Sequence, residues 1–206
     1  VGLAQPHEIN PDWKAWRAES LPMLPEQWPL TVLDATKDQF KTVKKIIQGR
    51  DVEYVVCATD AGREGELIFR FLYEAAGCRK PVRRLWISSL TPSAIRSGLL
   101  TMKDGRAYDS LAAAARGRAQ ADWLVGMNLS RAYTIAQGET FSVGRVQTPT
   151  LAMLVERELE IREFVPEAYV EVVGTFGATP YTGTWFKPGE SPSSESMRLA
   201  PDGQEA

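Results

Sequence analysis

Cysteine and histidine, two residue types that build many functional sites, are scarce in this sequence. Its two cysteines, Cys57 and Cys78, are too few for a disulfide framework. Cys57 lies in an apolar run typical of a protein core, which favours a reducing, cytoplasmic compartment. The single histidine, His7, excludes a metal site built from several histidines.

Long apolar runs and an overall positive charge are also lacking. No run approaches the roughly 18 apolar residues that span a bilayer, and residues 1–29 do not resemble a signal peptide, so we expect no membrane partner. The net charge is −2, so nucleic acid would have to bind a local basic region. One candidate region contains only basic charged residues, namely Arg79, Lys80, Arg83, Arg84, Arg96 and Lys103.

The length of 206 residues allows one ordinary domain or pieces of two. A hydrophobic content of 44% and a charged content of 24% are typical of a globular protein rather than a disordered one. The sequence does not begin with methionine, and its first thirty residues, rich in proline and tryptophan, are predicted to form an extended loop. We therefore expect a piece of a longer protein.

Residues 36–104 alternate between helical and strand patterns. The predicted elements are a helix over 36–48, a buried strand over 53–57, a helix over 67–76, a strand over 82–88 and a helix beginning at Pro92. This order is that of a βαβ unit, which requires a parallel sheet with a right-handed crossover.

From about residue 105 the pattern becomes helical. One Ala-rich helix is predicted from about 108 to 133, and a second over 146–163. Alternating residues then predict strands over 169–176 and 181–186. The remaining tail, rich in Ser, Pro, Gly and Glu, is predicted to be disordered.

Acidic residues follow the first predicted strand. Ligands of open α/β sheets bind at the carboxyl ends of strands, where Asp60, Glu64 and Glu66 fall, and Mg²⁺ prefers such oxygen ligands. Asp60 and Glu64 converge if a helix begins near Arg63. Alternatively, the acidic residues only complement the dipole of that helix. Arg63 either pairs with Asp60 or Glu66 or faces a phosphate.

Residues 142–148 combine small side chains, an arginine and a helix start, which suit phosphate binding. The alternative is an ordinary capped helix with Arg145 on its surface. Arg118 and Asp122 either contribute to the same groove or form a surface ion pair at i, i+4. We expect the basic strip of residues 79–84 to be a solvated edge and the tryptophans to serve packing.

The segment from Thr59 to Glu66, Thr-Asp-Ala-Gly-Arg-Glu-Gly-Glu, resembles the D-x-D-R-E-G-E signature of the Toprim domain in type IA DNA topoisomerases. Further blocks resemble the family in the family's order, at residues 86–91, 116–131, 142–150 and 155–158. Several independent blocks across roughly residues 1–176 argue against coincidence. The sequence is most similar to the bacterial topoisomerase III branch.

The resemblance implies an α/β fold class with four parts. These are a partial Toprim domain with a parallel βαβ sheet over 1–104, a helical DNA-groove domain over 105–165, the first strands of a β arch over 166–187, and the disordered tail over 188–206. The N-terminal strand of the Toprim domain would precede Val1, together with a further glutamate of the family's acidic site.

The resemblance also implies a set of site residues. Asp60 and Glu64 would belong to an acidic Mg²⁺ centre, with Glu64 exchanging a proton with the leaving 3′ oxygen and Arg145 clamping the backbone. Gly62 stands where a second aspartate is usual, which predicts weak metal binding. The residues expected to contact single-stranded DNA are Arg63, Arg118, Asp122, Ser142, Val143, Gly144, Arg145, Val146 and Gln147.

The family cleaves, passes and religates single DNA strands through a tyrosine in a Y-x-R-T-D motif. None of this chain's tyrosines is followed by x-R-T-D, so we expect the chain alone to be inactive, with the remainder of the enzyme as a partner. The expected location is the bacterial cytoplasm, in association with the nucleoid. Two alternatives stay open: another Toprim phosphotransfer enzyme, which would not need residues 142–150, and a non-catalytic remnant that binds single-stranded DNA.

Overall fold

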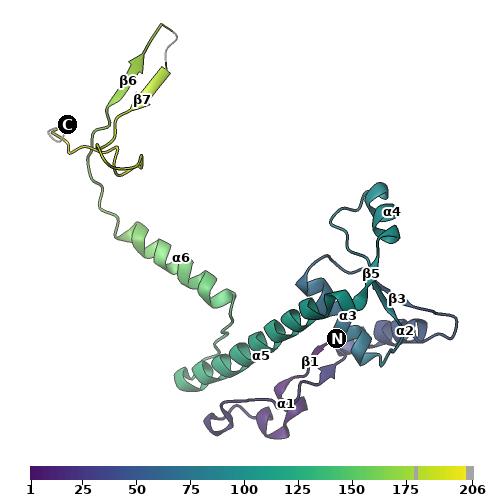
Figure 1. Ribbon diagram of the computed structural model, residues 1–206. Helices are drawn as coiled ribbons and strands as arrows, with labels where there is room; N and C mark the ends of the chain where they lie inside the picture. The colour runs from purple at the N-terminus through teal and green to yellow at the C-terminus, as the bar shows by residue number, and fades with distance from the viewer. Residues whose placement is uncertain (179–180, 203–206) are drawn as a thin grey trace. The chain divides into compact units, whose positions relative to one another are not determined.

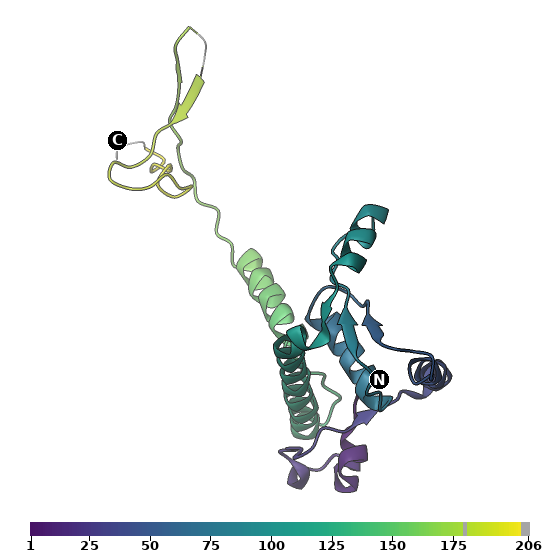
Figure 2. The ribbon, with the colours of Figure 1, turned by 45° about the vertical axis from the view of Figure 1, so that its right-hand side comes forward.

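The computed structural model describes residues 1–178 and 181–202 (Figures 1 and 2). The chain divides into two compact units, Val1–Leu151 and Ala152–Ala206, which we describe separately. No helix among the described residues is long and apolar enough to cross a membrane.

A three-stranded sheet lies in the first unit. Strands β3 (Val55–Cys57) and β4 (Val82–Arg84) run parallel, and helix α3 (Arg63–Ala75) connects them, which confirms the predicted βαβ unit. Strand β5 (Lys103–Asp104) pairs with β4 in the antiparallel direction. In this pair of strands Val55 of β3 lies opposite Val82 of β4. Strand β3 ends at Cys57, where the acidic turn begins.

Helices α2 (Lys37–Ile47), α4 (Pro92–Leu100) and α5 (Asp109–Gln137) match predicted helices. Thr91 caps α4, because its Oγ1 accepts a hydrogen bond from the backbone N–H of Ala94 at 3.3 Å. Helix α3 begins at Arg63 rather than at the predicted residue 67, since the N–H of Glu66 already donates to the carbonyl of Gly62.

The prediction of an extended loop over the first thirty residues is wrong. Strands β1 (Gly2–Leu3) and β2 (Leu30–Thr31) pair in the antiparallel direction, and helix α1 (Pro6–Ile9) and two 3-10 helices, Pro11–Lys14 and Ala18–Ser20, lie between them. Pro6 and Pro11 each occupy the first turn of a helix, where the missing N–H of proline is not needed. Proline therefore starts short helices here instead of excluding them.

Helices α3 and α5 lie side by side in Figure 1 and form a core of the first unit. Leu67 and Phe71 of α3 are buried against Ala115 of α5, and Leu3 and Leu30 of the N-terminal strands pack against them. The small alanine side chains of α5 allow this close packing. The N-terminal segment and the βαβ unit are therefore joined through one helix pair.

Trp123 of α5 makes further contacts that fix the N-terminal segment. Its indole N–H donates to the carbonyl of Ala4 at 2.9 Å, and its ring lies against Trp13 and Trp28 at centroid distances of 6.4 and 5.4 Å. These tryptophans serve packing, as predicted.

Helix α6 (Gln147–Arg162) begins in the first unit and continues into the second. In the second unit, β6 (Val173–Phe176) pairs with β7 (Tyr181–Thr184) in the antiparallel direction. Val170 forms a bridge with Leu199, which lies in the predicted tail, while residues 203–206 of that tail lie outside the described residues. The four domain boundaries given above stay predictions.

Candidate functional site

Residues 58–62 connect the end of β3 to the start of α3 and carry Asp60. Glu64 follows in the first turn of α3. Both side chains are exposed, and neither carboxylate makes a hydrogen bond or ion pair with another described residue. The structure therefore places two unpaired carboxylates at the carboxyl end of a parallel strand.

Arg84 holds the backbone of this turn. Its Nη1 donates to the carbonyls of Cys57 at 3.1 Å, Thr59 at 2.7 Å and Leu85 at 2.8 Å, and its Nη2 donates to that of Asp60 at 2.6 Å. The remaining donor, Nε, binds a carboxylate oxygen of Glu66 at 3.0 Å. One side chain thus uses all three of its nitrogens to fix the path of the chain between β3 and α3.

Arg84 is 1% exposed, so the prediction that it belongs to a solvated basic edge is wrong. Strand β4 turns this side chain inward, where its guanidinium lies 4.9 Å from the ring centroid of Trp86. Burial of the charge is tolerated because Glu66, itself 1% exposed, supplies the counter-charge.

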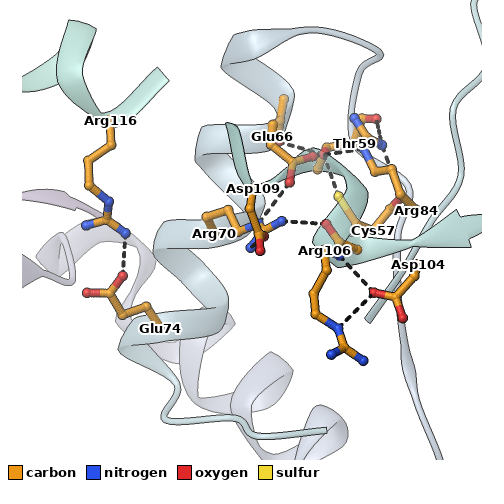
Figure 3. A network of polar contacts seen from close by, with 12 residues as sticks. Cys57, Thr59, Glu66, Arg70, Glu74, Arg84, Asp104, Arg106, Asp109 and Arg116 are labelled. Atoms are coloured by element: carbon orange, nitrogen blue, oxygen red, sulfur yellow. Dashed lines mark hydrogen bonds and ion pairs between the residues drawn. The ribbon is translucent and has the colours of Figure 1, made fainter. Parts of the chain in front are cut away.

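Glu66 extends the network to helix α5 (Figure 3). Its second oxygen accepts a hydrogen bond from Nε of Arg70 at 2.8 Å. Arg70 in turn contacts the carbonyl of Gly105 and the carboxylate of Asp109, both at 2.8 Å. The suggested pairing of Arg63 with Glu66 is wrong, since Glu66 pairs with Arg84 and Arg70; Arg63 is exposed.

Two glycines of the turn have different roles. A Cβ on Gly65 would lie 2.2 Å from the carbonyl oxygen of Asp60, so the close approach of α3 to the turn requires glycine there. The hydroxyl of Thr59 also donates to the Gly65 carbonyl at 2.6 Å. Gly62 has extended backbone, and a Cβ there would meet no atom within 4 Å. The position of the family's usual second aspartate is therefore sterically open.

Cys57, at the end of β3, belongs to the same turn. Its Sγ lies 3.4 Å from Oγ1 of Thr59, and burial raises the pKa of its thiol. Both Cys57 and Cys78 are free and buried, in agreement with the prediction that Cys57 lies in the core.

A second cluster forms where residues 142–147 lie against α5. Nη1 of Arg145 donates to a carboxylate oxygen of Asp122 at 2.8 Å, and Nε of Arg118 lies 3.8 Å from the other oxygen. The structure thus brings together three of the predicted DNA-binding residues. All three side chains are more than 40% exposed and are open to a ligand.

The segment before α6 is fixed by hydrogen bonds at both ends. Ser130 of α5 exchanges hydrogen bonds with the backbone of Val143, its Oγ accepting from the N–H at 2.9 Å. Nε2 of Gln147 donates to Oγ of Ser142 at 2.8 Å, and the N–H of Gly144 donates to Oγ1 of Thr148 at 3.1 Å. Val146 is exposed.

The acidic turn with Asp60 and Glu64 is one cluster, and Arg118, Asp122 and Arg145 form the other. Among the described residues, no hydrogen bond or ion pair joins Asp60 or Glu64 to Arg145. Likewise, no group of three or more His, Cys, Asp or Glu side chains in the described part of the chain could hold a metal ion. A metal ion at the acidic turn would therefore have only the carboxylates of Asp60 and Glu64 and water as ligands. Mg²⁺ commonly binds to one or two carboxylates and retains several waters.

The sequence analysis grouped Glu66 with the carboxylates suited to Mg²⁺ and Arg84 with a solvated edge, so it missed that this buried pair shapes the turn. It did not identify their partners Arg70 and Asp109. One signal could have identified Arg84. Side chains alternate along a strand, so Arg84 shares a face with Val82, whereas Arg83 points the other way and is exposed.

Comparisons with known proteins cover both clusters. Residues 4–90 match the Toprim domain family, and residues 106–197 match the DNA topoisomerase family. The chain is 51% identical to DNA topoisomerase 3 of Shouchella clausii (strain KSM-K16) and 47% identical to DNA topoisomerase 3 of Bacillus subtilis (strain 168), each over 82% of the chain. The aligned part is 23% of each relative, so the chain spans about a quarter of their length.

Proposed function

Because the chain belongs to the type IA DNA topoisomerase family, in its topoisomerase III-like branch, we propose that it supplies the metal-binding and strand-holding part of an enzyme that cleaves, passes and religates single DNA strands. One observation carries the proposal. Asp60 and Glu64 have exposed carboxylates without a partner among the described residues, and they lie on a turn that Arg84 fixes. Nothing else among the described residues competes for these two groups.

Asp60 and Glu64 would hold Mg²⁺. A bound Mg²⁺ would neutralise charge on the scissile phosphate and order it. The exposed position of both carboxylates leaves room for the waters that Mg²⁺ retains. With glycine at position 62, only two side chains of this turn are available, so weak binding is expected.

Glu64 would also handle a proton during strand cleavage. A tyrosine outside this sequence would attack the phosphorus and lose its proton to water, and the bond from phosphorus to the 3′ oxygen would break. Glu64 would give a proton to that oxygen and take it back during religation. The phosphotyrosyl link conserves the bond energy for resealing.

Residues 142–147 would hold the DNA strand. The guanidinium of Arg145 can contact a phosphate through two nitrogens. The carboxylate of Asp122 would orient this guanidinium, since its Oδ1 lies 2.8 Å from Nη1 of Arg145. Arg118, Arg63 and the small residues around Gly144 would contact the same backbone. The match of residues 106–197 to the DNA topoisomerase family favours this function over another Toprim phosphotransfer enzyme. A cytoplasmic, nucleoid-associated location and a role for the remainder of the enzyme follow from the proposal.

The test measures Mg²⁺ binding by calorimetry and oligonucleotide binding by fluorescence anisotropy. The double variant Asp60→Asn/Glu64→Gln should weaken Mg²⁺ binding by about tenfold or more, whereas Glu19→Gln/Glu26→Gln, which changes two exposed acids elsewhere, should leave it unchanged. Gly62→Asp should strengthen Mg²⁺ binding, because the site is sterically open and gains a third carboxylate.

Oligonucleotide binding separates the proposal from the remnant alternative. In the proposed enzyme part, Mg²⁺ changes the affinity for single-stranded DNA, and the double variant abolishes that change. Salt-dependent binding that ignores Mg²⁺ and is the same in the double variant would instead show a non-catalytic single-strand binding protein.

A further inference from the structure

A cavity of about 410 Å³ lies between the N-terminal segment, helix α5 and the start of residues 142–147. Its polar wall includes Gln5, His7, Lys14, Arg131 and Ser142, and the ring of Trp16 lies beside them. The volume falls in the range of small-ligand pockets and is large enough for one nucleotide. Ser142, one of the predicted DNA-binding residues, forms part of the wall.

None of the described residues that line this cavity is acidic. Three other cavities within residues 1–151 each have at least one acidic side chain in their wall. One is lined by Glu74 and Asp109, another by Asp104 and Asp109, and another by Glu26. Lys14 is exposed, and its ammonium group makes no hydrogen bond or ion pair with another described residue. The cavity therefore has a positive wall without an internal counter-charge.

Arg131 is the most informative residue of the wall. It is 6% exposed, yet no ion pair links it to a carboxylate of any described residue. Its Nη1 donates to the carbonyl of Trp13 at 2.6 Å, and its guanidinium lies 5.2 Å from the ring centroid of Trp16. Removal from water lowers the pKa of this guanidinium, which is the cost of a buried charge without an acidic partner.

The other two nitrogens of Arg131 point to what the site binds. Every buried side-chain nitrogen or oxygen among the described residues that are not exposed has a hydrogen-bond partner. Nε and Nη2 of Arg131 have no partner within the described part of the chain, so they must be accessible to solvent, and the cavity provides that access. Free guanidinium donors, a lysine and a positive wall are the features that bind a phosphate.

We propose that this cavity binds the phosphate of a nucleotide, with Arg131 and Lys14 as the donors and Trp16 beside the base. The inference rests on the proposed function for its preferred source, a single DNA strand that continues from Ser142 toward the N-terminal segment. Trp16 is 48% exposed and can stack on a base, a contact that is tolerant of sequence.

The first test uses a labelled oligothymidylate of about 12 nucleotides and a series of KCl concentrations. Lys14→Gln should weaken binding about threefold to tenfold and lower the slope of log K against log [KCl] by about 0.7, the value for one phosphate contact on a single strand. Lys44→Gln, which removes an exposed charge on α2, should do neither. Arg131→Gln should act as Lys14→Gln does, with circular dichroism to confirm its fold.

The second test adds thymidine monophosphate or inorganic phosphate and observes the indole N–H of Trp16 by NMR. A shift with either ligand that is lost in Lys14→Gln supports the phosphate site. Displacement of the oligonucleotide by micromolar thymidine monophosphate would identify a free nucleotide, rather than a strand, as the source.

The outcomes separate this inference from the proposed function. In one outcome, Arg145→Gln weakens oligonucleotide binding, Lys14→Gln leaves the affinity and the salt slope of that binding unchanged, and neither small ligand shifts the Trp16 signal. This outcome overturns the cavity inference and leaves the strand-holding role of residues 142–147 standing. If Mg²⁺ and the oligonucleotide fail to bind but phosphate shifts Trp16, the proposed function falls and the phosphate site stands.

Discussion

At the scale of single residues, the ion pair of Arg84 and Glu66 determines the shape of the acidic turn. Charged groups are buried at a large desolvation cost, which is offset only when the pair has good geometry and further hydrogen bonds. Here four backbone carbonyls and Arg70 supply those bonds. The two exposed carboxylates of the site therefore depend on two side chains that do not reach solvent themselves.

Arg84→Lys should destabilise the protein by about 3–5 kcal/mol, since lysine cannot reach the four carbonyls and leaves Glu66 without its planar partner. Urea unfolding followed by circular dichroism measures the change. The control is Arg83→Lys, the same substitution at the adjacent exposed residue, which should stay within about 0.5 kcal/mol of the wild type. Similar stabilities for the two variants would show that the buried network does not support the turn.

The sequence indicated which residues of this turn are candidate metal ligands, but not which residues hold the turn in place. Asp60 and Glu64 are identifiable because they follow a strand and match a known signature. Glu66 belongs to the same acidic run and differs from them only through burial, which depends on the position of α3 against β4. The partner of Glu66 lies 18 residues away in sequence, and no local pattern specifies a contact at that separation.

At the scale of elements, helix α5 connects the two clusters of the site. It begins beside the polar network at Asp109, carries Asp122 opposite Arg145, and further along presents Arg131 to the N-terminal cavity. Because these residues lie on one continuous helix, its integrity controls their spacing. Loss of helicity in the middle of α5 would uncouple the acidic turn from residues 142–147.

Two glycines allow a matched test of this helix. Gly117 lies in its interior, and a Cβ there would meet no atom within 4 Å, so Gly117→Ala should stabilise the protein by about 0.5–1 kcal/mol. Gly138 ends the helix at φ 72°, where alanine is strained, so Gly138→Ala should destabilise it by about 1 kcal/mol. Thermal unfolding should show shifts of opposite sign; shifts of the same sign would contradict these roles of the two glycines.

Elements with a local signal in the sequence were predictable, and short or context-dependent ones were not. Apolar spacing indicates helices α2 and α3, whereas α5 follows from its Ala-rich composition and α6 from the proline in its first turn. Strand β5 has two residues and exists only because β4 offers an edge. The N-terminal helices were missed because tertiary contacts, such as the bond from Trp123 to Ala4, order a segment whose composition alone favours a loop.

At the scale of the whole molecule, the described residues of the second unit do not by themselves cover the apolar side chains of helix α6. Helix α6 exposes Met153, Leu154, Val155, Leu159 and Ile161. Soluble domains rarely expose so many large apolar side chains on one helix, and such surfaces mark contacts with another chain or segment.

The purified 206-residue chain should leave supercoiled plasmid unchanged in the presence of Mg²⁺, and it should form no covalent adduct with DNA. In the proposed function Asp60, Glu64 and Arg145 would stabilise charge in the transition state. Strand cleavage also needs a nucleophile, and no tyrosine here is followed by x-R-T-D. Agarose gel electrophoresis of the plasmid measures the outcome, with a complete bacterial DNA topoisomerase 3 as the positive control. Relaxed products that disappear in Asp60→Asn/Glu64→Gln, purified in the same way, would show that the activity is intrinsic and that a tyrosine in another setting acts as the nucleophile.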